Sequence, residues 1–445
     1  MPVSPARAAA FDILLRVERE SSFASELLHS KPFGHLSGAD HALTTELVMG
    51  VLRWRSRIDA EIAPASSQSV TKLDLEVVIA LRLAAYQFWW LDRVPRRAAL
   101  HESVELVKRA RKRSAAPFVN AVLRKLSTRT LGLDSGAAGS AETLACAWAH
   151  PQWLVERWAR AYGMAQAEQI CCHDQKVPVT SIRLRSENAV EQLIEERVRL
   201  EPGALLSSAR RVIAGDITKT HGFRDGRVNI QDEASQLVAA LVGRNLGEQT
   251  EILDCCAAPG GKSLVIADRN PKAKVTAMEV HPHRARLLQK IVRDAPIQVV
   301  TGDATRLAAG ATFNRVLADV PCSGTGTLAR NPEIKWRLKP EDLPDLQSRQ
   351  RAILLSATSH TAPGGRVVYS TCSLEREENE DVIEQVLAEN ASFRVLDAQL
   401  ELKALQTAGD LVWPEPASLT RGPYLRTIPG VHPCDGFFAA ILAKN

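Results

Sequence analysis

The sequence predicts an α/β protein with an all-helical region in its first third. Three observations support this prediction. In residues 1–130 the apolar side chains recur at helical spacing, residues 131–145 are small and flexible in composition, and from residue 226 apolar strands alternate with helices. A chain of 445 residues is also too long for one ordinary core. We therefore expect a helical domain over 1–130, a linker over 131–145, a small α+β segment over 146–225 and an α/β domain over 226–445.

The first 130 residues favour a bundle of five to seven short helices. Ser37 or Asp40 is placed to cap the helix that contains Leu43, Leu47 and Val51. This region holds 20 Lys and Arg against 13 Asp and Glu, so its balance is 20 − 13 = +7, while the whole chain has a net charge of +5. The other residues therefore sum to 5 − 7 = −2. A basic region on a nearly neutral body favours a polyanionic partner.

A run of cations, residues 108–113, precedes a second basic helix over 117–125. Two interpretations remain open: contact with phosphate groups, which we favour, or the solvated end of a helix. The pair Trp89 and Trp90 is open in the same way, between base stacking and core packing, and here the core is favoured because Phe88 and Leu91 flank the pair.

Composition favours a globular protein of the cytoplasm. The chain is 45% hydrophobic and 24% charged, it begins without the apolar run of a signal peptide, and no apolar run is long enough for a bilayer. Its eight cysteines include no C-x-x-C pair, so we expect no metal site and free thiols. We expect no membrane partner, and a monomer is the starting assumption.

The α/β region is predicted to contain its strands and helices in alternation. The expected strands are 251–254, 274–280, 298–303, 316–319 and 366–372, with a long helix over 342–360 before the last of these. A final strand over 435–442 is expected to lie antiparallel at the sheet edge. Residues 177–184 and 189–196 are expected to form a strand and a helix of the small α+β segment.

A glycine turn follows the first strand of this region. Its sequence, Cys256-Ala257-Ala258-Pro259-Gly260-Gly261-Lys262, is neither the G-x-G-x-x-G of dinucleotide sites nor a phosphate-binding P-loop. Glu279 and Asp303 end the next two strands, where carboxylates can accept ribose hydroxyls and an adenine amine. The pattern favours a nucleoside without phosphate, and S-adenosylmethionine is the natural ligand.

Two thiols are predicted to meet at the same edge of the sheet. The strand that ends at Asp319 leads into Val320-Pro321-Cys322-Ser323-Gly324-Thr325-Gly326, and the last parallel strand ends in Ser370-Thr371-Cys372-Ser373. Ligands of open α/β sheets bind beyond the carboxyl ends of such strands. Two thiols and a carboxylate there are suited to covalent catalysis. The acidic residues 375–380 that follow are interpreted as solvated charge at a helix N-terminus.

These motifs together resemble the RNA cytosine-5 methyltransferases. Further segments resemble the bacterial branch that methylates small-subunit ribosomal RNA, the Sun/Fmu (RsmB) branch: Gln231-Asp232-Glu233-Ala234-Ser235, Asn331-Pro332-Glu333-Ile334-Lys335-Trp336 and Asp435-Gly436-Phe437-Phe438. Members of that branch carry an N-terminal helical domain like the antitermination factor NusB. The sequence departs from the family mildly, with Val320 where alanine is more frequent and Glu279 where aspartate is common.

The resemblance implies a Rossmann-like S-adenosylmethionine-dependent methyltransferase sheet, preceded by an all-α NusB-like helical domain and a small α+β segment, both of which contact RNA. It assigns Cys372 as the nucleophile that adds to cytosine C6, and Cys322 as the group that assists product release. Asp319 is implied to bind the N3/N4 edge of the base, and Lys262 to orient Asp319 or to lower the pKa of a thiol. The implied cofactor-binding residues are Cys256, Ala257, Ala258, Pro259, Gly260, Gly261, Lys262, Glu279, Arg284, Asp303 and Asp319.

Two other functions compete with this interpretation. A non-catalytic RNA-binding or antitermination protein would be expected to have degraded nucleotide and thiol motifs, and here they are intact. A methyltransferase of DNA or small molecules would be expected to use the Pro-Cys thiol as nucleophile and to lack the Thr-Cys partner. By chemistry alone the roles of the two thiols stay open.

Overall fold

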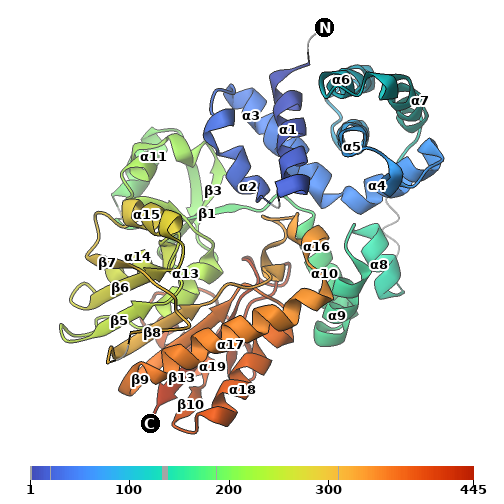
Figure 1. Cartoon of the computed structure of the whole chain (residues 1–445). Helices are drawn as coiled ribbons and strands as arrows, with labels where there is room; N and C mark the ends of the chain where they lie inside the picture. The colour runs from blue at the N-terminus through green and yellow to red at the C-terminus, as the bar shows by residue number, and fades with distance from the viewer. Residues whose placement is uncertain (1–2, 21, 133–138, 187, 309) are drawn as a thin grey trace. The chain divides into compact units, whose positions relative to one another are not determined.

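The computed structural model describes residues 3–20, 22–132, 139–186, 188–308 and 310–445. The chain comprises two compact units (Figure 1). The helical unit contains Met1–Val177 and a later segment, Leu328–Arg337, and the sheet unit contains Pro178–Thr327 and Leu338–Asn445.

The helical unit begins with seven α-helices in the described part of residues 1–130, as predicted. They are α1 (Pro5–Glu20), α2 (Ala24–Leu28), α3 (Gly38–Arg53), α4 (Arg55–Ser66), α5 (Leu75–Trp90), α6 (Arg96–Arg109) and α7 (Ala116–Ser127). Of the two candidate caps of α3, Ser37 is the N-cap, and its hydroxyl accepts a hydrogen bond from the amide of Asp40 at 3.1 Å. Trp89 and Trp90 pack against the core, as favoured.

Three further helices, α8 (Ala141–Ala147), α9 (Gln152–Tyr162) and α10 (Met164–Asp174), complete this unit. Helix α8 begins inside the segment expected to be a linker, because Ser140 and Thr143 form a capping box there. Residues 133–138 of the expected linker lie outside the described residues. The division between the units at Val177 also falls within the segment that was predicted to be one α+β region.

The segment Leu328–Arg337 is anchored in the helical unit by polar contacts, although it follows a motif of the sheet unit. The amide of Ala24 donates to Glu333 Oε1 at 2.8 Å, Lys335 Nζ donates to the carbonyl of Arg53 at 3.0 Å, and Trp336 Nε1 donates to the carbonyl of Leu52 at 2.6 Å. Its short helix α16 (Ile334–Arg337) therefore packs as part of the bundle.

A small antiparallel sheet opens the sheet unit, with strand order β2-β3-β1-β4. Its strands are β1 (Thr180–Leu184), β2 (Arg199–Pro202), β3 (Ala209–Ala214) and β4 (Val228–Ile230), and helices α11 (Ala189–Glu195) and α12 (His221–Arg224) accompany them. Strand β4 pairs with β1, so this sheet extends beyond the predicted end at residue 225. Arg183 and Arg185 both pair with Asp268, at 2.6 and 2.8 Å, which joins the sheet to helix α14.

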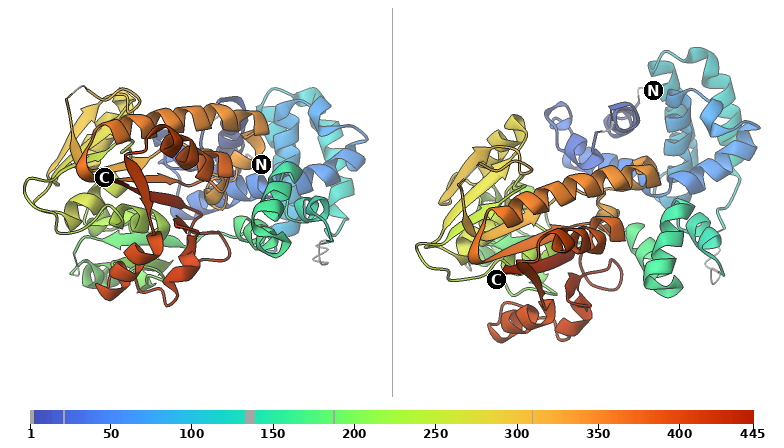
Figure 2. Two further views of the ribbon diagram at one scale, coloured as in Figure 1. Left: turned by 90° about the horizontal axis from the view of Figure 1, so that it is seen from below. Right: turned by 60° about the horizontal axis from the view of Figure 1, so that its bottom comes forward.

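The large sheet has nine strands in the order β11-β12-β13-β9-β8-β5-β6-β7, with β10 also paired to β13. In Figure 2 the long orange helix α17 (Leu343–Ser359) lies along one face of this sheet. The run from β9 to β7 is parallel. The strands are β5 (Glu251–Asp254), β6 (Lys274–Glu279), β7 (Ile297–Thr301), β8 (Phe313–Asp319), β9 (Thr361–Thr371), β10 (Phe393–Leu396), β11 (Thr420–Arg421), β12 (Tyr424–Arg426) and β13 (Phe438–Lys444). Strand β13 is antiparallel to β9 as predicted, but its expected place at the edge is wrong, because β10 and β12 pair with its other side.

Helices cover both faces of this sheet, because successive strand residues point to opposite sides. Ile252 and Leu317 pack into the core under α13, α14, α15 and α19, whereas Leu253 and Val316 pack into the core under α17 and α18. The helices are α13 (Glu233–Ala240), α14 (Gly261–Arg269), α15 (Pro282–Ile291), α17 (Leu343–Ser359), α18 (Glu380–Glu389) and α19 (Ala398–Thr407). Among the described residues, no helix has the length and apolar character needed to cross a membrane.

Candidate active site

The two predicted thiols meet beyond the carboxyl ends of neighbouring parallel strands. Strands β8 and β9 pair in a register that sets Asp319 beside Ser370. Cys322 lies three residues beyond the end of β8, and Cys372 directly follows the end of β9. The Sγ atoms of the two cysteines lie 3.3 Å apart. All eight cysteines are free thiols, and these two are partly buried. The pKa of the Cys322 thiol is raised well above its usual value, first by the hydrogen bond with Cys372 and then by burial.

The carboxylate of Asp319 is held between two donors at this edge. Lys262 Nζ lies 2.8 Å from Asp319 Oδ2, and the hydroxyl of Ser370 donates to Asp319 Oδ1 at 2.7 Å. Burial lowers the pKa of Lys262, but the attraction of Asp319 outweighs burial, so the pKa of Lys262 is raised and it remains a cation. Lys262 Nζ also lies 5.0 Å above the ring of Phe437.

A cavity opens beside this pair and is lined by the predicted glycine turn. The turn ends at Gly260, whose φ of +120° is suited to glycine, and α14 begins at Gly261. Asp254, at the end of β5, has its pKa raised to about 7 by burial and accepts a hydrogen bond from Ser263 at 2.7 Å. The lining residues are Ile230, Gln231, Ser235, Asp254, Cys256, Ala257, Ala258, Pro259, Gly261, Lys262 and Asp319.

The other predicted cofactor residues lie at the next strand ends, outside the lining of this cavity. Glu279 ends β6, is buried, and accepts a hydrogen bond from the amide of His281 at 2.9 Å. Arg284 Nη1 lies 3.7 Å from Glu279 Oε2. Asp303 follows β7 and is exposed, and hydrogen bonds from Thr305 lower its pKa. Since β5, β6 and β7 are parallel neighbours, these groups lie along the same edge of the sheet as the turn.

The loop that carries Cys322 is packed closely against the loop that carries Cys372. The amide of Gly326 donates to the carbonyl of Cys372 at 2.9 Å, and the amide of Gly436 donates to the carbonyl of Gly326 at 2.8 Å. A Cβ atom at Gly326 would lie 2.2 Å from the carbonyl oxygen of Gly436. Only glycine therefore permits this approach of three backbone segments.

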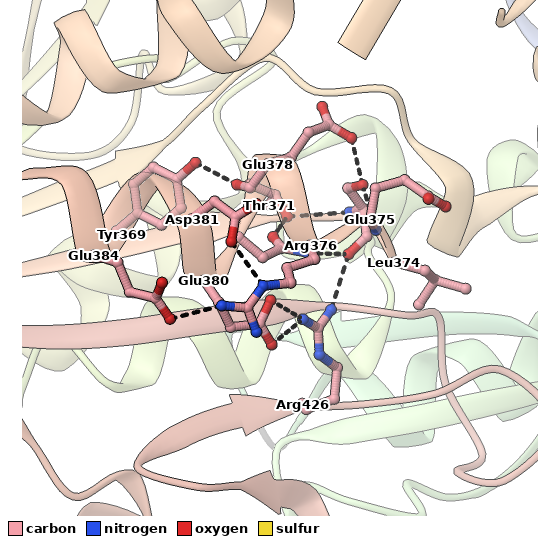
Figure 3. Close-up of polar contacts among 12 residues, drawn as sticks. Tyr369, Thr371, Leu374, Glu375, Arg376, Glu378, Glu380, Asp381, Glu384 and Arg426 are labelled. Carbon is pink, nitrogen blue, oxygen red and sulfur yellow. Dashed lines mark hydrogen bonds and ion pairs between the residues drawn. The ribbon is translucent and has the colours of Figure 1, made fainter. Parts of the chain in front are cut away.

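The acidic stretch after Cys372 differs from the prediction. Glu375 and Glu378 are buried, so the interpretation of residues 375–380 as solvated charge is wrong for these two. A short turn, Arg376–Glu378, precedes α18, and Figure 3 shows Glu378 there in contact with Tyr369 of β9. Arg426, also buried, pairs with Glu380 at 3.0 Å in the same region. Sequence patterns do not reveal this, because a buried glutamate and a solvated one look alike until their partners are known.

The basic run of the helical unit is partly neutralised by carboxylates. Arg109 pairs with Asp12 at 2.7 Å, Lys108 with Glu105 at 2.7 Å and Lys112 with Asp74 at 2.9 Å. Two cations of the run, Arg111 and Arg113, are exposed and have no ion pair among the described residues. The charge available to a polyanion is therefore smaller than the composition of the run indicates. Within the described residues, His, Cys, Asp and Glu form no group able to hold a metal ion.

Two known protein families match separate parts of the chain. Residues 4–128 match the NusB family model, and residues 242–443 match the model of the 16S rRNA methyltransferase RsmB/F. The probable ribosomal RNA small subunit methyltransferase B of Bacillus subtilis is 33% identical over 100% of both chains. The ribosomal RNA small subunit methyltransferase B of Shewanella oneidensis is 30% identical over 98% of this chain and 97% of its own.

Solved structures share the fold at lower identity. The crystal structure of PH0851 has a TM-score of 0.82 at 22% identity and covers 100% of both chains. The crystal structure of NSun6 from Pyrococcus horikoshii with SFG has a TM-score of 0.56 at 18% identity, over 66% of this chain and 98% of that chain.

Fold and matches together define the class: a NusB helical domain followed by a Rossmann-like methyltransferase domain with a mixed sheet. The chain belongs to the RsmB/F family of 16S rRNA methyltransferases. Enzymes of this family use S-adenosylmethionine as the methyl donor.

Proposed function

We propose that this protein methylates C5 of a cytosine in small-subunit ribosomal RNA through a covalent bond between Cys372 and C6 of the base. The observation that carries the proposal is the pair of thiols, with Sγ atoms 3.3 Å apart, beside the Lys262–Asp319 pair that lines the cavity. An RNA methyltransferase that modifies an oxygen or an exocyclic nitrogen has no need of two adjacent thiols. Methylation at C5 of cytosine does need a thiol, because C5 is a poor nucleophile until a thiolate adds at C6.

The cavity suits the methyl donor of the family. Its lining contains Gln231 Oε1, a buried acceptor that receives no hydrogen bond from the described residues. Such an atom is available to a donor group of a ligand. Glu279 and Asp303 lie at the neighbouring strand ends, where they are proposed to accept hydrogen bonds from the ribose hydroxyls and the adenine amine of the nucleoside. When bound, S-adenosylmethionine supplies an electrophilic methyl group on a sulfonium.

Cys372 is the proposed nucleophile, as the resemblance to the RNA cytosine-5 methyltransferases implies. Its Sγ lies 3.3 Å from that of Cys322, the thiol whose pKa is raised by this hydrogen bond and by burial. Cys372 attacks as its thiolate. When it bonds to C6, the electron pair of the C5–C6 double bond moves to C5, which takes the methyl group.

Cys322 is proposed to act in the second half of the reaction. Once the sulfur of Cys372 is bonded to C6, Cys322 loses its hydrogen bond with that thiol, which is the largest contribution to the raised pKa of Cys322. Cys322 can then lose its proton to solvent and take the proton from C5. The C5–C6 double bond forms again as the Cys372 thiolate leaves.

Asp319 and Lys262 are proposed to hold the base in place. One oxygen of Asp319 accepts from Ser370 and the other faces Lys262, which fixes the plane of the carboxylate. A carboxylate so placed can hydrogen-bond to the N3/N4 edge of cytosine as the thiolate adds. The remaining predicted cofactor residues are proposed to contact the methyl donor.

The helical unit and the small sheet are proposed to form the RNA-binding region. Its net charge of +7 over residues 1–130 follows from the 20 cations and 13 anions in that part of the sequence. The target base must leave its stack to reach the thiols, at a cost of a few kcal/mol that is lowest in loops or in incompletely assembled RNA. Because ribosomal RNA is the proposed substrate, we expect the protein to act in the cytoplasm.

The experiment compares the wild type with Cys322→Ala and Cys372→Ala on small-subunit rRNA with labelled S-adenosylmethionine. We expect 5-methylcytidine from the wild type, a persistent protein–RNA adduct with Cys322→Ala, and neither adduct nor product with Cys372→Ala. The reverse pattern would show that the thiols have exchanged roles. If label appears in a nucleoside other than 5-methylcytidine, or no variant forms an adduct, the covalent C5 mechanism is wrong.

A further inference from the structure

One buried carboxylate joins the two loops that carry the thiols. Glu378 is 0% exposed and lies in the turn between β9 and α18. Its Oε2 accepts hydrogen bonds from the hydroxyls of Ser323 and Ser373, the residues that directly follow Cys322 and Cys372. These two serines lie 50 residues apart in the sequence, so Glu378 ties together loops that the chain itself does not connect.

The second oxygen of Glu378 also accepts hydrogen bonds, one of them from the loop that carries Cys322. Oε1 accepts from the backbone amide of Ser323 and from Gln350 Nε2, both at 2.8 Å. Gln350, on α17, also donates to the carbonyl of Pro321 at 3.0 Å, on the other side of Cys322. The carboxylate thus accepts four hydrogen bonds, which is as many as its two oxygens take. Three of the four donors belong to the two serines.

The turn that carries Glu378 is itself held in place by residues of strand β9, Tyr369 and Thr371 (Figure 3). The hydroxyl of Tyr369 donates to the carbonyl of Glu378 at 2.6 Å. The next residue, Asn379, accepts from the Thr371 hydroxyl at 2.5 Å and donates to the Ser373 carbonyl at 2.9 Å. The position of Glu378 is therefore set by strand β9, and its carboxylate transmits that position to both thiol loops.

We propose that Glu378 is a positioning residue that sets the distance between the sulfur atoms of Cys322 and Cys372. The proposal rests on the proposed function, because the distance between the two sulfurs matters when one thiol attacks C6 and the other takes the proton from C5. Without the carboxylate, four donors lose their common acceptor and the loops lose the group that joins them. The two thiols then separate, although each remains present.

The length of the side chain distinguishes positioning from a requirement for charge. Glu378→Gln keeps the reach: its amide oxygen can take the place of Oε1, and its NH₂ can donate to the two serine hydroxyls, which are able to accept. Glu378→Asp keeps the charge but is one methylene shorter, so it cannot reach both serines. Positioning therefore predicts that the Gln variant is close to wild type and the Asp variant is not.

The test has a readout that needs neither RNA nor methyl donor. The folded full-length protein is treated with diamide, a diazene that accepts two electrons and two thiol protons as the disulfide forms, and the Cys322–Cys372 bond is followed by peptide mass spectrometry. Sulfurs 3.3 Å apart need only a small movement to reach a bond of about 2.05 Å. We expect the rate to fall at least tenfold in Glu378→Ala and Glu378→Asp, and less than threefold in Glu378→Gln.

Methyl transfer is measured on the same proteins. We expect kcat to fall in the same order as the cross-linking rate, with KM for RNA changed less than threefold. The matched control is Val386→Ala, which removes two methyl groups from a buried side chain of α18 and none of the hydrogen bonds to Glu378. It loses stability but is expected to keep both rates within twofold of the wild type.

Each outcome decides between the possibilities. Wild-type cross-linking and kcat in folded Glu378→Asp would overturn the proposal, and so would an Asp variant that exceeds the Gln variant. If Val386→Ala loses both rates as strongly, Glu378 acts only through stability. If cross-linking falls as expected but the wild type yields no 5-methylcytidine, the positioning stands and the proposed function fails.

Discussion

Lys335 offers a sharp test of how burial acts within the helical unit. Its side chain is 1% exposed, and burial lowers its pKa from 10.5 to about 7, against the attraction of Asp174 and Cys171 and together with repulsion from Arg53. The Nζ atom donates to the carbonyl of Arg53 at 3.0 Å. We predict that replacing this lysine by methionine, which has a similar length, removes a pH dependence of stability.

The sign of this pH dependence follows from the number of protons that Lys335 binds in the folded and in the unfolded chain. Between pH 7 and pH 10.5 the unfolded chain keeps a proton on Lys335 that the folded chain has lost, so the free energy of unfolding rises with pH in that window. The resulting cost of burial is about 4 kcal/mol at pH 7 and about 2 kcal/mol at pH 9, from about 1.4 kcal/mol per pKa unit. The wild type is therefore expected to gain about 2 kcal/mol relative to Lys335→Met between these two pH values.

Urea unfolding followed by tryptophan fluorescence provides the measurement. Seven of the eight tryptophans lie in the helical unit, so the signal reports mainly on that unit. The cysteines of the unfolded chain also ionise above pH 8, but this contribution is common to both proteins and cancels in the difference. Lys31→Met removes an exposed lysine of the same unit and is expected to leave the pH profile unchanged. A difference between wild type and Lys335→Met that is equal at pH 7 and pH 9 would refute the reasoning.

Three further changes have defined outcomes. Gly326→Ala places a Cβ atom 2.2 Å from a backbone oxygen, so we expect at least a tenfold loss of single-turnover methyl transfer in a protein that still folds; undiminished turnover would contradict the close packing of the loops. Removing both Arg111 and Arg113 is expected to weaken RNA binding and to reduce the slope of log affinity against log salt by about 1 to 2, measured by filter binding, and an unchanged slope would exclude phosphate contact there. Ser37→Ala is expected to cost about 1 kcal/mol of stability in thermal unfolding, because α3 loses its cap; a loss below about 0.3 kcal/mol would show that the cap contributes little.

Local patterns determined much of the sheet unit. Strand β5 has the predicted bounds, and the long helix before β9 differs from its prediction by one residue at each end. These elements are short apolar segments between clear breaks, so burial and turn chemistry act in the same direction. The meeting of Cys322 and Cys372 could likewise be expected, because neighbouring parallel strands bring their carboxyl ends to one edge.

Other features depended on partners that are distant in sequence. The place of β13 inside the sheet was not predicted, because its pairing with β10 and β12 leaves no local signal. The segment Leu328–Arg337 follows the thiol loop directly yet packs in the helical unit, through backbone acceptors such as the carbonyls of Leu52 and Arg53. A pattern read along the chain does not contain such acceptors.

By itself the sequence determined which groups are present for chemistry: two thiols, a carboxylate and a lysine at strand ends, after a glycine turn. Only the tertiary structure decided how close they lie and which acidic residues support them. The physical reason is that hydrogen bonding and burial depend on the surroundings of a side chain in three dimensions. Glu378 looks like any other acidic residue in the sequence, and only the folded chain surrounds it with four donors.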